Sequence, residues 1–321
     1  MAGLVVIASM LCGATAHAQT PLRAKARYPL KISKPGSYIL LENLEVKNGD
    51  AIVVTANHVS IDLNGFSILG AGADSETSGM GINAAGRSFI TISHGSVAGF
   101  SGNGIMLGDD ASVKGVHADS NGPLGIFCKS DCSIADSSAS NNGIDGIVAG
   151  ANSVITGNLA NNNHKGVGIT IARNSSAAGN VANLNGGGGI LGVSAALPCH
   201  CRIVGNTAND NGSFGIIAGD FGVLTQNVAD GNASFGICGG RSSAISGNTA
   251  GANALEGIIA NKGSVVLGNS SVDNGGLGLS FPQDNTSAFG FNAMLNNHIA
   301  DTSGGSSMGQ GDTNLCSGQN C

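Results

Sequence analysis

A short unit repeats along most of this chain, and it limits the fold more than any other feature of the sequence. The pair Gly-Ile, once Gly-Leu, recurs at ten glycines with intervals of 23, 21, 21, 22, 21, 26, 21, 21 and 21 residues. The marker glycines are Gly81, Gly104, Gly125, Gly146, Gly168, Gly189, Gly215, Gly236, Gly257 and Gly278. A unit of 21 or 22 residues is too short for two helices with their turns, but it accommodates three short strands and three tight turns.

Aligned units also share columns of one residue type. An asparagine precedes most marker glycines by four or five residues, at Asn121, Asn142, Asn163, Asn185, Asn211, Asn232, Asn253 and Asn274. A second asparagine column lies five residues earlier, an alanine column three residues earlier, and isoleucine follows nearly every marker glycine. If each unit is one coil of a solenoid, identical residues stack. We therefore expect isoleucine and alanine to fill a continuous core and the asparagine amides to bond from coil to coil. Glycine and asparagine are expected to supply the left-handed turn positions.

The composition excludes the competing classes. With 53 Gly but only 6 Pro among 321 residues, the chain is neither collagen nor a helical bundle. A hydrophobic share of 41% and a net charge of −6 argue against disorder. A sequence pI of about 5.5 argues against a nucleic-acid partner. The expected fold is all-β, a single right-handed parallel β-helix of about ten coils, whose hand follows from the crossover preference of parallel strands.

Two features carry a resemblance to a known group. One is the opening segment, residues 32–38 (Ile-Ser-Lys-Pro-Gly-Ser-Tyr) followed by residues 59–66 (Val-Ser-Ile-Asp-Leu-Asn-Gly-Phe); the other is the repeated Gly-Ile and Gly-Asn coil. In these features the chain resembles bacterial secreted right-handed parallel β-helix proteins of the pectin-lyase-like superfamily. The resemblance covers residues 30–297. It implies the fold strongly and the function weakly, because the superfamily holds lyases, hydrolases, epimerases and adhesins.

Four parts of the chain are expected. Residues 1–18 resemble a secretory signal peptide, with an apolar run at residues 4–12 and Ala-His-Ala before the polar Gln19, although no basic residue precedes the run. Residues 19–50 are expected to form an N-terminal cap, residues 51–297 the β-helix, and residues 298–321 a C-terminal tail or cap. The predicted location is therefore secreted or periplasmic, and no further apolar stretch is long enough to span a membrane.

Seven cysteines remain after the predicted leader, so at least one thiol is unpaired within the chain or pairs with another molecule. Cys132 and Cys201 share a column but stand three coils apart, too far to be bridged. Local pairs are therefore expected, Cys128 with Cys132 and Cys316 with Cys321. Cys199, His200 and Cys201 offer soft ligands for copper or zinc, but three such residues without a second group fit a surface loop better than a metal site.

One outward column carries charge. Five residues after successive marker glycines stand Arg173, Ser194, Asp220, Arg241 and Lys262. Two interpretations stay open, a strip that holds an acidic sugar chain with Arg241 or Lys262 as a base, and a solvated turn column. A second column, two residues after the marker glycines, is largely apolar and is expected to face outward, where the tail, a second copy or a ligand would cover it.

Two functions follow as alternatives. The first is an exported protein that binds or processes a polysaccharide on its lateral face; if it is an enzyme, the resemblance implies a polysaccharide lyase or a glycoside hydrolase. The second is a non-catalytic structural or adhesive protein that forms homo-oligomers through the apolar column. No residue is assigned as catalytic and no cofactor is expected, calcium entering through the resemblance alone.

Overall fold

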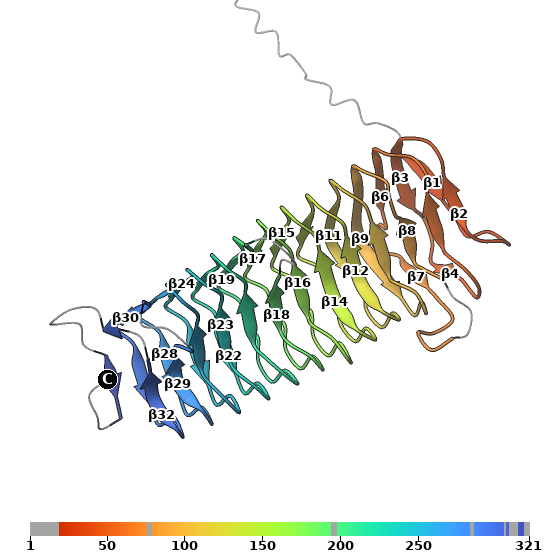
Figure 1. Ribbon diagram of the computed structural model, residues 1–321. Helices are drawn as coiled ribbons and strands as arrows, with labels where there is room; N and C mark the ends of the chain where they lie inside the picture. Colours follow the sequence, from red (N-terminus) through yellow and green to blue (C-terminus); the bar gives the residue numbers. More distant parts are fainter. Residues whose placement is uncertain are drawn as a thin grey trace, which may run out of the picture.

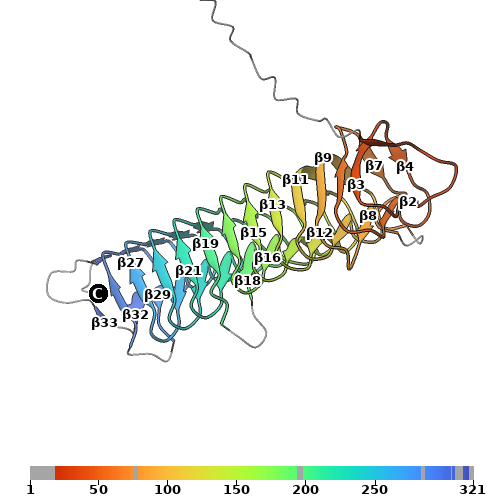
Figure 2. The ribbon, with the colours of Figure 1, turned by 90° about the horizontal axis from the view of Figure 1, so that it is seen from above.

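The chain winds into an elongated rod, with its first strands at one end and its last strands at the other (Figures 1 and 2). The structure is a computed structural model that describes residues 19–75, 79–193, 198–282, 286–304, 306–307 and 314–317. All strand pairings within it are parallel and join one coil to the next, and the described residues contain no helix. The predicted all-β parallel β-helix is therefore confirmed.

The strands form three sheets along the rod. The 16-stranded sheet contains β1 (Thr20–Leu22), β3 (Gly36–Leu40), β4 (Leu44–Glu45), β6 (Val59–Asp62), β7 (Ser67–Leu69), β9 (Ile90–Ala98), β11 (Ser112–His117), β13 (Ser133–Ala135), β15 (Val154–Thr156), β17 (Ser176–Ala178), β19 (Arg202–Val204), β21 (Val223–Thr225), β24 (Ala244–Ser246), β27 (Val265–Leu267), β30 (Ala288–Gly290) and β33 (Ser306–Ser307). The 13-stranded sheet contains β2 (Leu30–Ile32), β5 (Ile52–Val54), β8 (Ile82–Ala84), β10 (Ile105–Leu107), β12 (Leu124–Cys128), β14 (Asp145–Ala149), β16 (Ile169–Ile171), β18 (Ile190–Gly192), β20 (Ile216–Ala218), β23 (Ile237–Gly239), β26 (Ile258–Ala260), β29 (Leu277–Ser280) and β32 (Ala300–Ser303). A 5-stranded sheet contains β22 (Val228–Asp230), β25 (Thr249–Gly251), β28 (Ser270–Val272), β31 (Ala293–Leu295) and β34 (Leu315–Cys316).

The rod has about 13 turns, three more than the ten marker glycines predict. The ten marked coils correspond to β8 through β29 of the 13-stranded sheet. Strands β2 and β5 precede them in the same register, with Pro29 and Ala51 where the later coils have glycine. Strand β32 follows β29 without the Gly-Ile pair. The residues predicted as a cap and as a tail thus contribute strands to the same sheets.

The predicted core columns are confirmed. The isoleucine after each marker glycine is at most 1% exposed, and its partner in the next coil is again isoleucine, as in Ile126 with Ile147 and Ile147 with Ile169. The alanine column is fully buried from Ala118 to Ala250. Because every coil buries the same few side chains against its two neighbours, the core runs the length of the rod as one cluster.

The asparagines form two buried ladders. After Asn121, which uses its backbone N–H alone, the side-chain Nδ2 and the backbone N–H of one asparagine donate to the Oδ1 of the next, as Asn232 does to Asn253 at 2.9 and 3.0 Å. Nδ2 also donates to a backbone carbonyl of the preceding coil, that of Ala208 for Asn232. The ladders contain Asn121, Asn142, Asn163, Asn185, Asn211, Asn232, Asn253, Asn274 and Asn297, and Asn158, Asn180, Asn206, Asn227, Asn248, Asn269, Asn292 and Asn314. Every buried amide therefore has partners, as a core of this polarity requires.

The bends place a left-handed residue directly before each ladder position from Asn121 to Asn297. These residues include the expected glycines and asparagines, such as Gly179 and Asn162, but also Leu184, Ala252 and Phe291. The marker glycines are absent from this left-handed set. They are required for a different reason. A Cβ on Gly146 would lie 2.6 Å from the carbonyl oxygen of Gly168 and 2.8 Å from Nδ2 of Asn163. Close approach of neighbouring coils therefore explains the most regular residue of the repeat.

Candidate functional site

The outer face of the 13-stranded sheet carries a half-exposed apolar column. It is formed by the middle residues of successive strands, which alternate with buried neighbours: Met106, Phe127, Val148, Thr170, Leu191, Ile217, Cys238 and Ile259. This outward column was predicted from the sequence; only Ser280, at 9% exposure, departs from it by being buried. At ~4.8 Å per coil the column is an extended stripe.

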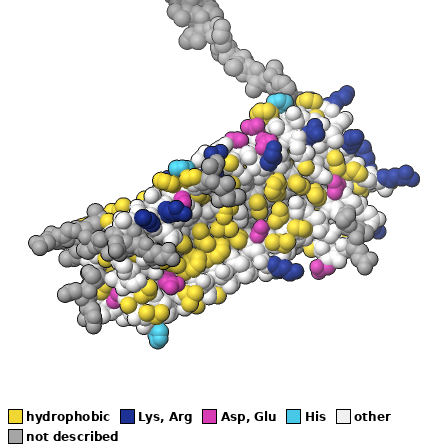
Figure 3. All heavy atoms as spheres, in the orientation of Figure 1, with side chains coloured by type: hydrophobic (Ala, Val, Ile, Leu, Met, Phe, Trp, Pro, Cys, Tyr) yellow, Lys and Arg dark blue, Asp and Glu magenta, His cyan; other side chains and the backbone are white. Residues whose placement is uncertain are grey.

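A second column lies beside the first, at the residue before each marker glycine. It contains Leu124, Asp145, Val167, Gly188, Phe214, Phe235, Glu256 and Leu277. The rings of Phe214 and Phe235 lie 6.1 Å apart at 15° to each other. Gly188 makes room for Phe214, since a Cβ there would collide with its ring. We call the two columns together the apolar face; Figure 3 shows hydrophobic side chains gathered over these strands, with Lys and Arg along one edge.

The described part of residues 298–321 does not lie across the apolar face. Strand β32 continues the 13-stranded sheet beyond β29, and β34 continues the 5-stranded sheet beyond β31. These described residues therefore extend the end of the rod and leave the apolar face uncovered.

The charged strip is only partly contiguous. The backbone N–H of Arg241 donates to Oδ1 of Asp220 at 2.8 Å, and its Nε lies 3.8 Å from Oδ2. Lys262 occupies the same bend position one coil further on, because Phe221 N–H donates to the Arg241 carbonyl and Ser242 N–H to the Lys262 carbonyl. The Arg241 and Asp220 side chains are 73% and 39% exposed, so this ion pair adds little stability and is accessible to a ligand.

Arg173 is separated from the other three residues. Asn174 N–H donates to the carbonyl of Cys199, and His200 N–H donates to that of Asp220, so Cys199 takes the bend position between Arg173 and Asp220. The Cys199 side chain is buried. The structure thus brings together Asp220, Arg241 and Lys262 but not Arg173; Ser194 lies outside the described residues.

An aromatic pair adjoins the strip and was missed in the sequence. His200 stacks on Phe221, with centroids 5.1 Å apart, and both residues are exposed and left-handed at the bend. A sequence signal was present, because His200 and Phe221 occupy the column one residue after the charged column. This pair adds a flat, partly apolar contact beside the charges.

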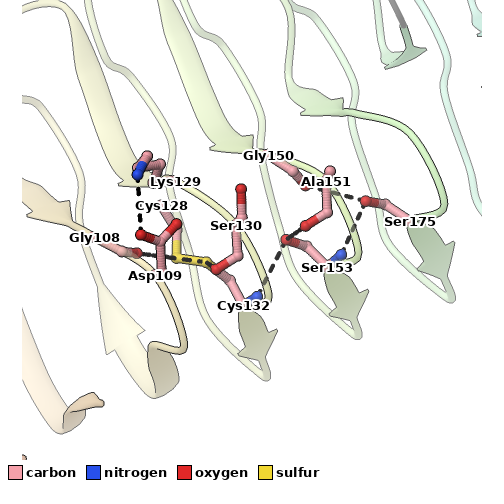
Figure 4. Close-up of a disulfide and its surroundings, with 10 residues drawn as sticks. All are labelled: Gly108, Asp109, Cys128, Lys129, Ser130, Cys132, Gly150, Ala151, Ser153 and Ser175. Carbon is pink, nitrogen blue, oxygen red and sulfur yellow. Dashed lines mark hydrogen bonds and ion pairs between the residues drawn. A yellow bond between two sulfur atoms is a disulfide. The ribbon is translucent and has the colours of Figure 1, made fainter. Parts of the chain in front are cut away.

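Disulfides close the same bend at two places. Figure 4 shows Cys128 bonded to Cys132, with Lys129 paired to Asp109 at 3.0 Å on the outer side. Cys132 begins a buried column continued by Ser153 and Ser175, whose hydroxyls accept backbone N–H groups of the preceding coil. A second disulfide joins Cys199 to Cys201. The pairing of Cys316 with Cys321 stays a prediction, because Cys321 lies outside the described residues.

The Cys199-His200-Cys201 segment does not present thiolates. Both sulfur atoms are used in the disulfide and both side chains are buried. Within the described ranges, no three His, Cys, Asp or Glu side chains gather closely enough to hold a metal ion. Cys238, on the apolar face, is the free cysteine of the described residues, and burial raises its pKa to about 11. Its thiolate is therefore scarce at neutral pH.

Two carboxyl groups, Asp145 and Asp230, have a raised pKa. Burial raises the pKa of Asp145, and the N–H of Val167, which donates to Oδ1 at 2.6 Å, opposes this. Burial also raises the pKa of Asp230, with a further contribution from the charge of Asp210 against the hydrogen bond from Gly251. Asp145 stands on the apolar face and Asp230 on a different side of the coil, so they do not form an acid–base pair.

Comparisons with known proteins identify the fold. No family model matches the chain, and no curated protein is significantly similar to it. Among solved structures, the Dettilon tailspike protein (gp208) superposes with a TM-score of 0.57 at 15% identity, over 85% of this chain and 58% of that one. The A-module of Azotobacter vinelandii mannuronan C-5 epimerase AlgE6 has a TM-score of 0.53 at 16% identity, over 94% and 88%. The tailspike protein of E. coli bacteriophage HK620, in complex with a pentasaccharide, has a TM-score of 0.57 at 11% identity, over 86% and 64%.

These likenesses are of fold alone. The chain spans less than two thirds of each of the two tailspike proteins. They confirm that the chain shares its overall fold with these proteins; that fold is the parallel β-helix described above. In the described part of the chain, no helix is long and apolar enough to cross a membrane.

Proposed function

We propose that this is an exported protein that binds a polysaccharide along the apolar face and the adjoining bend. The observation that carries the proposal is the juxtaposition, on one side of the rod, of the half-exposed apolar columns with Asp220, Arg241 and Lys262. Two proteins with a similar fold, the mannuronan C-5 epimerase AlgE6 A-module and the HK620 tailspike in complex with a pentasaccharide, support it by analogy. The leader-like residues 1–18 support export to the periplasm or the medium.

The chemistry of a sugar chain fits this surface. The C–H faces of sugar rings are apolar and pack on aliphatic and aromatic side chains such as Ile217 and Phe214. Arg241 offers several N–H donors to carboxylate or hydroxyl oxygens, and Asp220 accepts hydroxyl protons. The 3.8 Å separation of Nε from Oδ2 leaves the guanidinium free to reorient toward a ligand.

Binding is better supported than catalysis. A lyase or hydrolase needs an acid and a base within reach of one sugar bond. Asp145 and the Asp220–Arg241 pair are on opposite edges of the face, and Asp145 precedes Asp220 by three coils in the register of the 13-stranded sheet. We therefore propose a binding protein. The alternative is a lyase that uses Arg241 or Lys262 as its base, and an activity screen tests it.

A glycan array tests the proposal directly. The wild-type chain is expected to bind acidic glycans, and the variant Arg241→Ala/Lys262→Ala is expected to lose at least tenfold in affinity, since each charge-assisted hydrogen bond contributes about 1.5–3 kcal/mol. The matched control is Lys114→Ala/Arg202→Ala, which removes two exposed cations from the 16-stranded sheet. No binding by the wild type, or equal loss in the control, refutes the proposal. Absorbance of unsaturated products on the same glycans reports lyase activity.

The apolar face also supports a second candidate, a structural or adhesive protein that assembles through this surface. This candidate is favoured by the aliphatic character of the columns, which include Ile217 and Ile259 and few aromatic residues. Sedimentation velocity distinguishes the two. If copies assemble here, the wild type sediments as an oligomer and Ile217→Asp/Ile259→Asp as a monomer; a monomeric wild type excludes this candidate.

A further inference from the structure

The first coil of the rod is unusually basic. Residues 20–41 contain five basic side chains and no acidic one, whereas the whole chain has a net charge of −6. The five are Arg23, Lys25, Arg27, Lys31 and Lys34, and all are exposed. The nearest acid with a defined contact is Glu42, whose Oε1 accepts the backbone N–H of Ala24. The remaining 299 residues carry 9 basic and 20 acidic side chains, so the positive charge is concentrated in one coil.

This coil forms the end of the rod. Strand β1 is the terminal strand of the 16-stranded sheet, and β2 is the terminal strand of the 13-stranded sheet. Arg23, Lys25 and Arg27 lie on the segment between these two strands, Lys31 lies within β2, and Lys34 follows it before β3. The cations therefore border successive sides of the end coil. Figure 3 shows Lys and Arg side chains concentrated at this end of the molecule.

Protection of the sheet edge does not explain the sign of this charge. Charged side chains and prolines at a terminal strand discourage the addition of foreign strands. Pro21, Pro29 and Pro35 stand in this coil and supply that protection. Acidic residues would serve equally well, and at the other end residues 263–321 contain four aspartates and no lysine or arginine. The two ends thus differ in sign, which edge protection does not require.

We propose that the basic first coil docks end-on against an anionic lipid surface, through the phosphates of its headgroups. Cations distributed around the end of a rod match a planar array of negative charge better than they match a single polymer strand. Each lysine or arginine near such a surface contributes to attraction that falls off within a Debye length. A second copy, whose acidic end could approach this coil, is disfavoured as the occupant, because Pro21 within β1 cannot donate a backbone hydrogen bond to an added strand.

Vesicle sedimentation with the full chain tests the proposal. The wild type is expected to partition onto vesicles of phosphatidylglycerol and phosphatidylcholine more strongly than onto phosphatidylcholine alone, and salt near 1 M should abolish the difference. Residues 1–18 are present in both measurements, so the difference in partition between the two vesicle types reports the contribution of lipid charge. Arg23→Gln/Lys25→Gln/Arg27→Gln is expected to weaken partition onto the anionic vesicles about 100-fold.

A matched variant and a second coil variant complete the test. Lys114→Gln/Lys165→Gln/Arg202→Gln removes three exposed cations from elsewhere on the rod and should leave partition nearly unchanged. Lys31→Gln/Lys34→Gln, which alters the other half of the coil, should weaken it about 30-fold. Equal binding to both vesicle types, or equal loss in the matched variant, overturns the proposal. The proposal is also overturned if sedimentation velocity shows that the wild type forms end-to-end oligomers and that only the coil variants are monomeric.

Discussion

Neighbouring coils approach so closely at the marker glycines that a single methyl group there has no space. The hypothetical Cβ contacts at Gly146 are to backbone and to a ladder amide, neither of which can rotate away. The sequence analysis identified these glycines as part of the repeat, but it attributed glycine to left-handed turn positions and not to close packing. Periodicity reveals which positions are constrained, whereas only the stacked coils reveal what constrains them.

Gly146→Ala is therefore expected to destabilise the protein by about 3 kcal/mol, the upper range for overpacking a filled interior. Gly179→Ala is the control, because Gly179 has a φ of +63° but open space around its Cβ. Its cost is left-handed strain alone, about 1 kcal/mol. Denaturant unfolding compares the two variants, and an equal or smaller loss for Gly146→Ala would contradict the close-approach explanation.

Asp145 gives stability a defined dependence on pH. Its pKa in the folded chain is raised above the ordinary value of 3.8, so folding favours the protonated carboxyl. The associated stability is fully present below the unfolded-state pKa and is lost as pH rises through the folded-state pKa. Asp145→Asn keeps the Oδ1 acceptor for Val167 but does not ionise.

The melting temperature of Asp145→Asn should therefore rise relative to the wild type as pH increases from about 3 to 6. Asp230→Asn, where burial raises the pKa in the same direction, should show the same trend. A gap between variant and wild type that stays constant over this range would show that the Asp145 carboxyl is not perturbed.

At the level of the coil, the sequence predicted the repeat well and its ends poorly. The asparagine and isoleucine columns identify ten coils because their contacts depend on residue identity. The first two coils have Pro29 and Ala51 at the marker position and escape detection, because they lack the Gly-Ile pair. Terminal coils have one neighbour fewer, so fewer of their residues are fixed by stacking.

The candidate site was only half predictable for a related reason. A regular interval places Asp220, Arg241 and Lys262 in one column, and the structure keeps them together. Arg173 lies two coils from Asp220, as the column predicts, and Cys199 takes the bend position between them. The Phe214–Phe235 pair went unnoticed because its column mixes apolar, acidic and glycine residues.

The short disulfides are expected to contribute modestly. The Cys128–Cys132 bond closes a loop of only four residues in sequence separation, so the chain-entropy estimate is about 2 kcal/mol. Cys128→Ser/Cys132→Ser should lower the free energy of unfolding by that amount or less, because serine at position 132 matches the hydroxyl column of Ser153 and Ser175. Equilibrium unfolding measures it, with the free Cys238→Ser as control; a loss above about 4 kcal/mol would contradict the entropic account.

Over the whole molecule, each coil depends mainly on the coils directly beside it. Removing residues 232–252, one complete period, would join Gly231 to Asn253 and leave Asn211 with Asn253 as its new ladder partner. This deletion is expected to give a folded, shorter rod, since solenoid stability is a sum over neighbouring coils.

Removing residues 232–243 instead shifts the register by part of a coil and places polar residues in the core columns, so this variant should not fold. Circular dichroism and thermal unfolding distinguish the two deletions. Failure of the full-period deletion to fold would show that the coils are not interchangeable in this region.

The ladders also bear on how the protein ages chemically. Five ladder asparagines precede glycine: Asn121, Asn142, Asn185, Asn211 and Asn274. Such pairs deamidate when the glycine nitrogen attacks the side-chain carbonyl, which makes asparagine one of the thermolabile residues. Here that nitrogen is committed to the coil before, as Gly212 N–H donates to the Asn185 carbonyl at 2.7 Å, while the amide is held by its neighbours. The folded rod thus protects its Asn-Gly pairs from deamidation. The rate of deamidation is then set by how often a coil unfolds locally.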